Sequence, residues 1–487
     1  MGQPGRVLST APVIMWFRRD LRLADQPALG AAVERARATD GSVLPLFVLD
    51  PRLGSVSGQN RLAFLYRALR SLQADGVPLV VRLGEPEREL PAFAAELGAS
   101  HVYVTADFGV YGDDRDRRVG DALRRSGVSF EPVESNYVIP PGVVRKGDDT
   151  PFKVFTPFKR VWETLADSVR PAGRIDPHLV PWWRDTVSEE IPADPAGASG
   201  FLPEVSETAA HERLHRFLAG PVDDYADTRN IPGADATSRL SADLKFGLLH
   251  PRQILPSLRS GGPGADVFRS ELCWREFYAD VLWHRPETAR RSLITAMDEI
   301  RVDEGPLADE RFDAWRLGRT GYPFIDAGMR QLLREGWMHN RVRMAAASFL
   351  VKDLHLDWRR GARWFMDQLV DGDLASNQHG WQWTAGTGTD ASPYYRVFNP
   401  ILQGKKFDPD GDYIRRYVPE LRDVSNRFIH EPWLAPSTTA ALFDAEMTVR
   451  TDSYPPPIVD HFAERLDALA RYEEIRSADG SRIGDAR

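Results

Sequence analysis

The chain has 487 residues, a net charge of −8 and one cysteine, Cys273. This length accommodates two or three domains with buried cores, and a single cysteine excludes internal disulfides. No apolar run is long enough to span a membrane, and the N-terminal segment lacks the apolar core of a signal peptide. We therefore expect a soluble, cytoplasmic protein, and because its total charge is acidic, any nucleic-acid contact must come from a local basic patch.

The first part of the chain alternates short apolar runs with helical patterns. Val13–Phe17 is continuously apolar, which is typical of a strand buried on both faces of a parallel sheet. Further strands are predicted at Val43–Leu49, Leu79–Leu83, His101–Thr105 and Val128–Val133, and helices at Arg61–Leu72 and Asp116–Arg125. The alternation predicts a doubly wound, Rossmann-like α/β domain over residues 10–140. The dinucleotide fingerprint G-x-G-x-x-G follows none of these strands.

The rest of the chain is predicted to be a connection followed by a helical domain. Residues 141–205 are rich in Pro, Gly and Asp and show little periodicity, which predicts a long interdomain connection. Residues 206–475 show amphipathic helical patterns separated by short turns, which predicts an all-α domain. The segment His211–His215 matches the zinc-peptidase pattern H-E-x-x-H, but no third ligand is evident, so we expect no metal.

Three helical segments carry chemistry rather than core packing. In ELCWREFY, Glu271, Trp274, Arg275 and Tyr278 fall on one helix face, which is too polar for a core stripe and suits a pocket wall. In GWMHNRVRM, Asn340 and Met344 share a face, with Arg341 and Arg343 beside it. Upstream, TSRLS (Thr237–Ser241) precedes a helical run, and a Thr or Ser cap leaves outward-pointing N–H groups that favour an anion.

The stretch Asp371–Pro400 is the densest in polar and aromatic groups. It reads DGDLASNQHGWQWTAGTGTDASPYYRVFNP and follows neither a helical nor a strand period throughout. Trp381 and Trp383 lie about 200° apart around a helix, so they serve different surfaces. We expect the scaffold to hold this stretch against a large planar ligand.

These motifs, in this order, resemble the photolyase/cryptochrome family, most closely the class I photolyases of cyclobutane pyrimidine dimers. The N-terminal WFRRDLRLAD, the connecting VFTPFKR, TGYPFIDAGMRQL and FLVKDL extend the resemblance over nearly the whole chain. The resemblance implies an N-terminal antenna domain and a C-terminal helical domain that binds FAD. In this family the fully reduced flavin anion donates an electron to the dimer in light.

The resemblance also implies which residues contact the cofactor and the DNA. The flavin contacts carried over are Tyr225, Thr237, Ser238, Arg239, Leu240, Ser241, Glu271, Arg275, Asn340, Arg343, Asp371, Asp373 and Asn377. Arg343 and Asp371 are expected to form an ion pair beside the flavin ring, where a cation stabilises the reduced anion. Asn377 is expected near flavin N5, as in photolyases; plant cryptochromes typically have aspartate there and animal cryptochromes cysteine.

The expected partner is UV-damaged DNA with a flipped-out dimer. Trp274 and Trp383 are expected to form the aromatic walls of its pocket and Glu271 to hydrogen-bond the pyrimidine edge. Asn340 and Met344 stand where (6-4) photolyases carry histidines, which favours the cyclobutane dimer as substrate. The phosphate contacts expected around the mouth are Arg229, Arg341, Arg396 and Lys405. A blue-light-sensing cryptochrome without repair and a (6-4) photolyase remain the alternatives.

Two features of the family are incomplete in this chain. Trp381 and Trp358 match the inner and middle members of the family's tryptophan electron relay, but the outer position offers Glu304 or Gly305, and Trp315 is a candidate substitute. The loop VYGDD lacks the Asn-Glu pair of folate-binding members. With Asp107, Tyr111 and Lys245 as candidate contacts, we expect an 8-hydroxy-5-deazaflavin antenna in preference to a reduced folate, and a monomeric protein.

Overall fold

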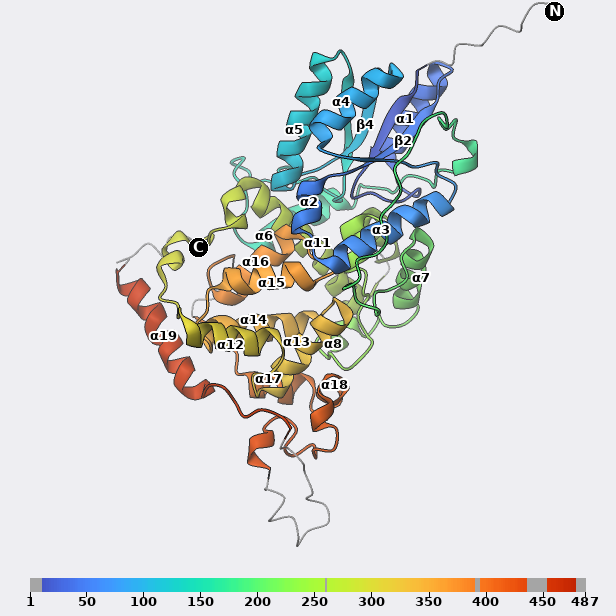
Figure 1. The fold of residues 1–487 in the computed structure, drawn as a ribbon. Helices are drawn as coiled ribbons and strands as arrows, with labels where there is room; N and C mark the ends of the chain where they lie inside the picture. Colours follow the sequence, from blue (N-terminus) through green and yellow to red (C-terminus); the bar gives the residue numbers. More distant parts are fainter. Residues whose placement is uncertain (1–10, 259–260, 390–394, 436–452, 479–487) are drawn as a thin grey trace, which may run out of the picture.

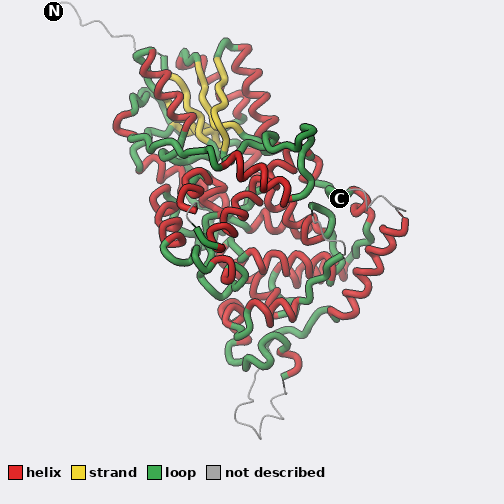
Figure 2. Tube along the Cα trace, turned by 180° about the vertical axis from the view of Figure 1, so that it is seen from behind, coloured by secondary structure: helices red, strands yellow, loops and turns green. Residues whose placement is uncertain are grey.

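The computed structural model describes residues 11–258, 261–389, 395–435 and 453–478. One end of the molecule is an α/β domain and the rest is helical (Figures 1 and 2). The five strands are parallel, in the order β3-β2-β1-β4-β5. Their bounds are β1 Val13–Phe17, β2 Val43–Leu49, β3 Val80–Leu83, β4 His101–Ala106 and β5 Ser129–Ser135. The predicted fold class is confirmed, and each predicted strand is present to within two residues at either end.

Helices cover both faces of the sheet, so its central strand is buried on both sides. Val13, Met15 and Phe17 of β1 belong to the core under α1 and α3, whereas Ile14 and Trp16 belong to the core under α4 and α5. This is the alternation that a pleated strand imposes. The helices of this domain are α1 Pro27–Ala38, α2 Pro51–Val56, α3 Gln59–Ala74, α4 Pro86–Leu97 and α5 Val110–Arg125.

The connection between the two parts contains a helix that the sequence reading missed. Helix α6, Phe155–Ala166, buries Phe158, Trp162 and Ala166, which recur every fourth residue. This apolar stripe was present in VFTPFKRVWETLA but was masked by the surrounding Pro and Gly. The expectation of a segment with little periodicity was therefore wrong for these residues.

The helical part packs around α11, α14 and α16. Its helices are α7 Glu207–Leu218, α8 Tyr225–Thr228, α9 Ser241–Phe246, α10 Pro251–Ile254, α11 Pro263–His284, α12 Pro306–Arg316, α13 Pro323–Glu335, α14 Asn340–Lys352, α15 Trp358–Gln368, α16 Leu374–Ala385, α17 Pro400–Phe407, α18 Asp412–Tyr417 and α19 His461–Ala478. Helix α16 packs on α11, α14 and α15. The portion of Asp371–Pro400 that forms α16 therefore lies at the centre of the helical part. Residues 390–394 of that stretch lie outside the described ranges.

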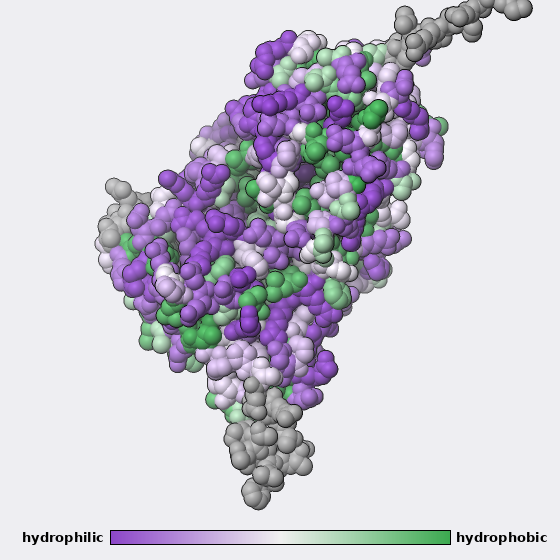
Figure 3. Space-filling view, viewed as in Figure 1, coloured by the Kyte–Doolittle hydropathy of each residue, from purple (hydrophilic) through white to green (hydrophobic). Residues whose placement is uncertain are grey.

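The two parts share a hydrophobic core. The cluster that contains Phe17 and Phe64 of the sheet domain continues through Leu244 to Leu272 and Phe277 of α11. Hydrophilic residues cover most of the face shown in Figure 3, and the hydrophobic side chains there form small separate groups. Among the described residues, no helix has the length and apolar character needed to cross a bilayer.

Candidate functional site

The predicted polar face of α11 is the half-exposed face of that helix. Glu271, Trp274, Arg275 and Tyr278 are each partly exposed, whereas the residues between them are buried. Trp274 is stacked on Phe155 with ring centroids 3.6 Å apart and planes at 7°, so one face of the indole is covered by α6. The contact with Phe155 was not foreseen, because no local pattern pairs these two distant segments.

Glu271 is held by an arginine from the neighbouring helix end. Arg229 Nη1 lies 2.7 Å from Glu271 Oε1, and the Arg229 guanidinium lies 5.6 Å from the centroid of the Tyr225 ring. Burial, and secondly the Glu271 carboxylate, raise the pKa of Tyr225 to about 12. Tyr225 and Glu271, which are predicted flavin contacts, and Arg229, a predicted DNA contact, therefore lie together at α8 and α11.

Asn340 and Met344 lie side by side on α14, as predicted. Asn340 Nδ2 is 3.9 Å from Met344 Sδ, and both side chains are accessible from one side of the helix. The helix is capped by His339, whose Nδ1 accepts a hydrogen bond from the Arg341 N–H. Burial, and secondly the Arg343 charge, lower the pKa of His339 to about 3, so this imidazole is neutral at physiological pH.

The expected ion pair between Arg343 and Asp371 is present. Arg343 Nη2 lies 2.8 Å from Asp371 Oδ2, and Arg343 Nε donates to the Met338 carbonyl. The second carboxylate oxygen, Asp371 Oδ1, is buried without a hydrogen-bond partner. A buried carboxylate oxygen without a donor is costly, so a bound group with an N–H or O–H at this point would stabilise the site.

Asp373 connects the helical part to the sheet domain. Its carboxylate caps α16 by accepting from Ser376 N and lies 3.1 Å from Arg19 Nη2 and 3.6 Å from Lys245 Nζ. Arg19 also lies 3.7 Å from Asp107. These contacts join Asp107 and Lys245, two antenna candidates, to a residue expected at the flavin.

Burial and neighbouring charges shift the pKa values of the residues in this network. Desolvation, and secondly the Arg19 charge, lower the pKa of Lys245 to about 7. The charges of Arg19 and Arg115 keep the pKa of Asp107 below its usual range, although burial alone would raise it. The third antenna candidate, Tyr111, donates to Asp50 instead, and its pKa is raised by burial and by that carboxylate.

The segment Thr237–Ser241 does not cap a helix in the predicted way. Helix α9 begins at Ser241 after Leu240, and no side chain caps it. Arg239 has a left-handed backbone (φ 51°), and its guanidinium lies 4.2 Å from the Trp337 ring and 3.3 Å from Glu335. The expectation of a Thr or Ser cap was wrong, but the uncapped N–H groups of the first turn suit an anion.

Trp381 and Trp383 point to different surroundings, as their spacing predicts. Trp381 is 3% exposed and packs on Phe365 and Trp315, at ring distances of 5.0 and 6.1 Å. Trp383 is half-buried with Arg396 5.9 Å from its ring. Asn377, one turn before Trp381 on α16, donates a hydrogen bond to the Ala362 carbonyl of α15.

The remaining candidates for phosphate contact differ in how their charges are compensated. Arg341 donates to the Asn230 side-chain oxygen (2.8 Å) and lies over the Phe407 ring, neither of which is charged. Lys405 forms an ion pair with Glu431. Arg341 is therefore better placed than Lys405 to meet a phosphate with its full charge.

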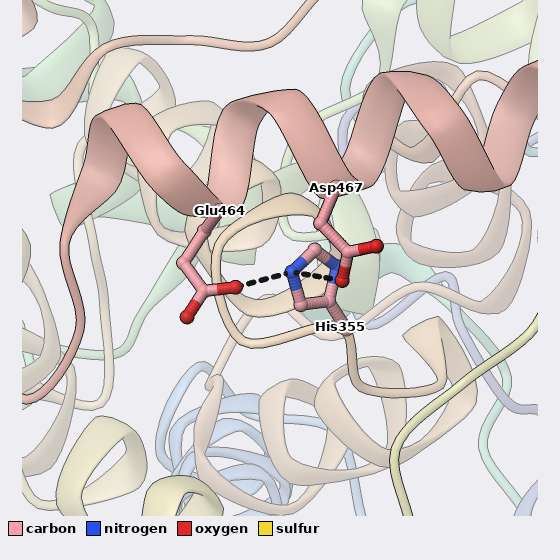
Figure 4. Close-up of side chains that lie close together, drawn as sticks. All are labelled: His355, Glu464 and Asp467. Carbon is pink, nitrogen blue, oxygen red and sulfur yellow. Dashed lines mark hydrogen bonds and ion pairs between the residues drawn. The ribbon is translucent and has the colours of Figure 1, made fainter.

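In the described parts of the chain, one group of side chains has the spacing of a metal site. Glu464 and Asp467 project from α19 toward His355 (Figure 4), with His355 Nε2 2.7 Å from Glu464 and 3.5 Å from Asp467. Arg471 lies 2.8 Å from Asp467, and Arg311 lies 3.7 Å from Glu464. Because arginines already balance both carboxylates, we interpret this group as an ion-pair network.

Comparisons with known proteins agree with this geometry. Residues 13–176 match the family model described as DNA photolyase, and residues 268–474 match the FAD binding domain of DNA photolyase. The deoxyribodipyrimidine photo-lyase of Escherichia coli K12 is 39% identical, over 95% of this chain and 98% of its own length. That of Streptomyces griseus is 41% identical, over 96% and 99%.

Solved structures of a photolyase and of a cryptochrome also match nearly the whole chain. A class III photolyase from Agrobacterium tumefaciens superposes with a TM-score of 0.88 at 37% identity, over 98% of this chain and 100% of its own. A cryptochrome from Synechocystis sp. PCC6803 superposes with a TM-score of 0.83 at 29% identity, over 96% and 99%.

Proposed function

This chain belongs to the DNA photolyase family, and on that premise we propose that it is a deoxyribodipyrimidine photo-lyase that splits cyclobutane pyrimidine dimers in light. When bound, fully reduced FAD excited by light supplies the electron that opens the dimer. The protein's part would be to hold cofactor and lesion in a fixed geometry and to exclude water.

The choice of lesion rests on one observation, the contact between Asn340 and Met344 on α14. Neither side chain titrates near neutral pH, so this surface cannot supply the proton transfer that a (6-4) lesion needs. The neighbouring His339 is buried and neutral, and its Nδ1 is occupied as the helix cap. A dimer that needs only an electron and its return fits this surface.

The dimer would enter between α11 and the end of α16. Trp274, backed by Phe155, provides a rigid aromatic wall, and Trp383 provides the second. Stacking on such rings is worth roughly 1–3 kcal/mol per base. Glu271, oriented by Arg229, would accept a hydrogen bond from the pyrimidine edge. Arg341 and Arg396 would contact the flanking phosphates.

The residues present fit FAD. The uncapped first turn of α9 suits its pyrophosphate, and the unpartnered Asp371 Oδ1 offers an acceptor to a ring or ribityl group. Arg343, paired with Asp371, would supply a positive charge that stabilises an anionic ring bound there. Arg275, another expected flavin contact, donates to the carbonyls of Asn136 and Leu244, which fixes its guanidinium in place.

For the antenna, we propose 8-hydroxy-5-deazaflavin near Asp107, Tyr111 and Lys245. The chain of contacts from Asp107 through Arg19 to Asp373 supports this position, because it joins the sheet domain to the expected flavin site. The absorption spectrum of chromophores released from the purified protein tests the assignment. A reduced folate in that spectrum would contradict it.

The repair assay tests the function itself. Protein with chemically reduced flavin is mixed with oligonucleotides that carry either a cyclobutane dimer or a (6-4) lesion and is illuminated with blue light. We expect loss of the cyclobutane dimer alone. Repair of the (6-4) lesion would reassign the substrate, and repair of neither, with flavin bound and reduced, would favour the cryptochrome alternative.

A further inference from the structure

The first turn of α3, in the sheet domain, carries two buried polar side chains that face the helical part. Asn60 and Arg61 are each 6% exposed, although amide and charged side chains are rarely buried without a specific partner. Helix α3 lies beside α15 (Figure 1), and these two side chains reach the end of α15 and the turn that follows it. That turn, residues 368–372, includes Asp371, an expected flavin contact.

Both side chains hydrogen-bond to main-chain carbonyls of the turn. Asn60 Nδ2 donates to the Gln368 carbonyl at 2.7 Å, and its Oδ1 accepts from the Ser199 N–H at 2.8 Å. Arg61 Nη1 lies 3.4 Å from the Leu369 carbonyl, to which it donates. Because these partners belong to the main chain, the bonds fix the path of the backbone just before Asp371.

Two glycines leave the room that this contact needs. An added Cβ at Gly372 would lie 2.7 Å from Arg61 Nη1, and one at Gly336 would lie 2.5 Å from Asn60 Nδ2. The Gly336 carbonyl, at the end of α13, also accepts from the Val370 N–H at 2.8 Å. The turn is therefore held both by α3 of the sheet domain and by the end of α13.

Arg61 also brings a buried positive charge close to Asp371. In the described ranges of the chain its guanidinium forms no ion pair, and its hydrogen bonds go to main-chain carbonyls. Burial lowers the pKa of Arg61, and the carboxylates of Asp367 and, secondly, Asp371 act in the opposite direction. Two arginines therefore act on the Asp371 carboxylate, Arg343 by direct contact and Arg61 from a greater distance.

We propose that Asn60 and Arg61 are positioning residues of the flavin site, which hold the 368–372 turn so that Asp371 stays oriented toward Arg343 and a bound flavin. The inference rests on the flavin site of the proposed function. Asp371 Oδ1 is buried without a partner, so its value as an acceptor depends on where the turn places it. The charge of Arg61 adds to that of Arg343 in stabilising an anionic ring. The sheet domain thereby contributes two residues to the flavin site.

The rival explanation is that these residues only hold the two parts of the molecule together. Another arginine of α3 separates the two explanations. Arg67, six residues after Arg61, pairs with Asp194 of the connection at 2.6 Å. This pair fastens the same helix to a different segment of the chain, so Arg67→Gln is the matched control for Arg61→Gln.

The test is titration of the flavin-free, full-length protein with oxidised FAD, followed by measurement of the midpoint potential of the bound flavin. We expect Asn60→Ala and Arg61→Gln each to weaken FAD binding roughly tenfold, because each leaves a carbonyl of the turn without its donor. Arg61→Gln should also lower the midpoint potential, since a positive charge near the reduced anion is lost. Arg61→Lys should restore the potential, and Arg67→Gln should change neither quantity.

FAD affinities of Asn60→Ala and Arg61→Gln equal to that of Arg67→Gln would overturn the inference. Asn60→Ala keeps the buried charge, so its affinity decides the question even if Arg61→Gln does not fold. The proposed function is judged separately, by dimer repair after chemical reduction of the flavin. Unchanged protein that binds FAD but repairs no dimer would refute the repair function and leave the roles of Asn60 and Arg61 standing.

Discussion

At the scale of single residues, Glu271 is the residue that we expect to hydrogen-bond the pyrimidine edge. The Arg229 guanidinium orients the carboxylate from one side, and the half-exposed position on α11 leaves the other side open. A partly exposed ion pair contributes little to stability. We therefore expect the pair to matter for recognition more than for folding.

Replacing Glu271 by Gln should weaken dimer binding while leaving the fold intact. The substitution keeps the shape but removes the charge that strengthens a hydrogen bond to the pyrimidine, a loss of about 1.5–3 kcal/mol or roughly ten- to hundredfold in affinity. Titration of dimer-containing DNA measures it. Flavin content and melting temperature should match those of Glu310→Gln, on an exposed helix surface; loss of flavin would show that Glu271 serves the cofactor instead.

Arg341 and Lys405 form a contrasting pair for DNA binding. Because Arg341 has neutral partners and Lys405 is paired with Glu431, we expect Arg341→Gln to reduce the slope of log affinity against log salt concentration by about 1. Lys405→Gln should change it less. Affinity measured at several salt concentrations checks both variants, and equal slopes for the two would contradict the assignment.

At the scale of helices, the contact between α15 and α16 is set by one glycine. Gly361 allows the Trp381 ring to approach the backbone of α15, with Leu350 of α14 beside it. A side chain at this position would separate the helices that carry Trp358, Asn377 and Trp381. The close approach therefore positions the tryptophans expected to form an electron relay and the expected flavin contact Asn377.

Gly361→Ala should be strongly destabilising for this reason. The added methyl would lie 2.2 Å from Trp381 and 2.7 Å from Leu350, and such overpacking costs about 1–3 kcal/mol or more. The matched control is Gly30→Ala in α1, where no atom lies within 4 Å. That variant should gain about 0.5–1 kcal/mol from helix propensity. Denaturant unfolding distinguishes them, and similar stability of both variants would contradict the packing argument.

At the scale of the whole molecule, buried titratable groups join the two parts. Glu276 of α11 accepts from the backbone N–H of Ile139 and from the Trp162 indole at 3.1 and 2.5 Å, so it fastens the connection to the helical core. Burial raises its pKa to about 6. Because an acid with a raised pKa prefers its protonated form in the fold, Glu276 loses stabilisation as pH rises from about 4.5 to 6.

His379 of α16 acts in the opposite sense. Burial lowers its pKa to about 4, so between pH 6.5 and 4 the unfolded state binds a proton that the folded state does not. Its contribution to stability therefore falls as pH falls through that window, by up to about 1.4 kcal/mol per unit. We expect His379→Gln to have a shallower loss of unfolding free energy between pH 6.5 and 4 than the unchanged protein. Parallel curves would show that His379 is not the titrating group.

The sequence alone determined the features that depend on local patterns. Apolar runs bounded by turns located all five strands, because such runs are typical of strands that are buried on both faces. Helical spacing identified the half-exposed face of α11 and the shared face of Asn340 and Met344. Ordered motifs then pointed to the family, and with it to FAD.

Only the tertiary structure decided which distant side chains meet. Trp274 stacks on Phe155, Asp373 pairs with Arg19, and Tyr395 stacks on Tyr472, each across a long stretch of chain. Helical or strand periodicity specifies which face of an element is apolar, but not which other element covers it. That choice follows from packing the whole chain, so the contacts that anchor the candidate site became visible only in three dimensions.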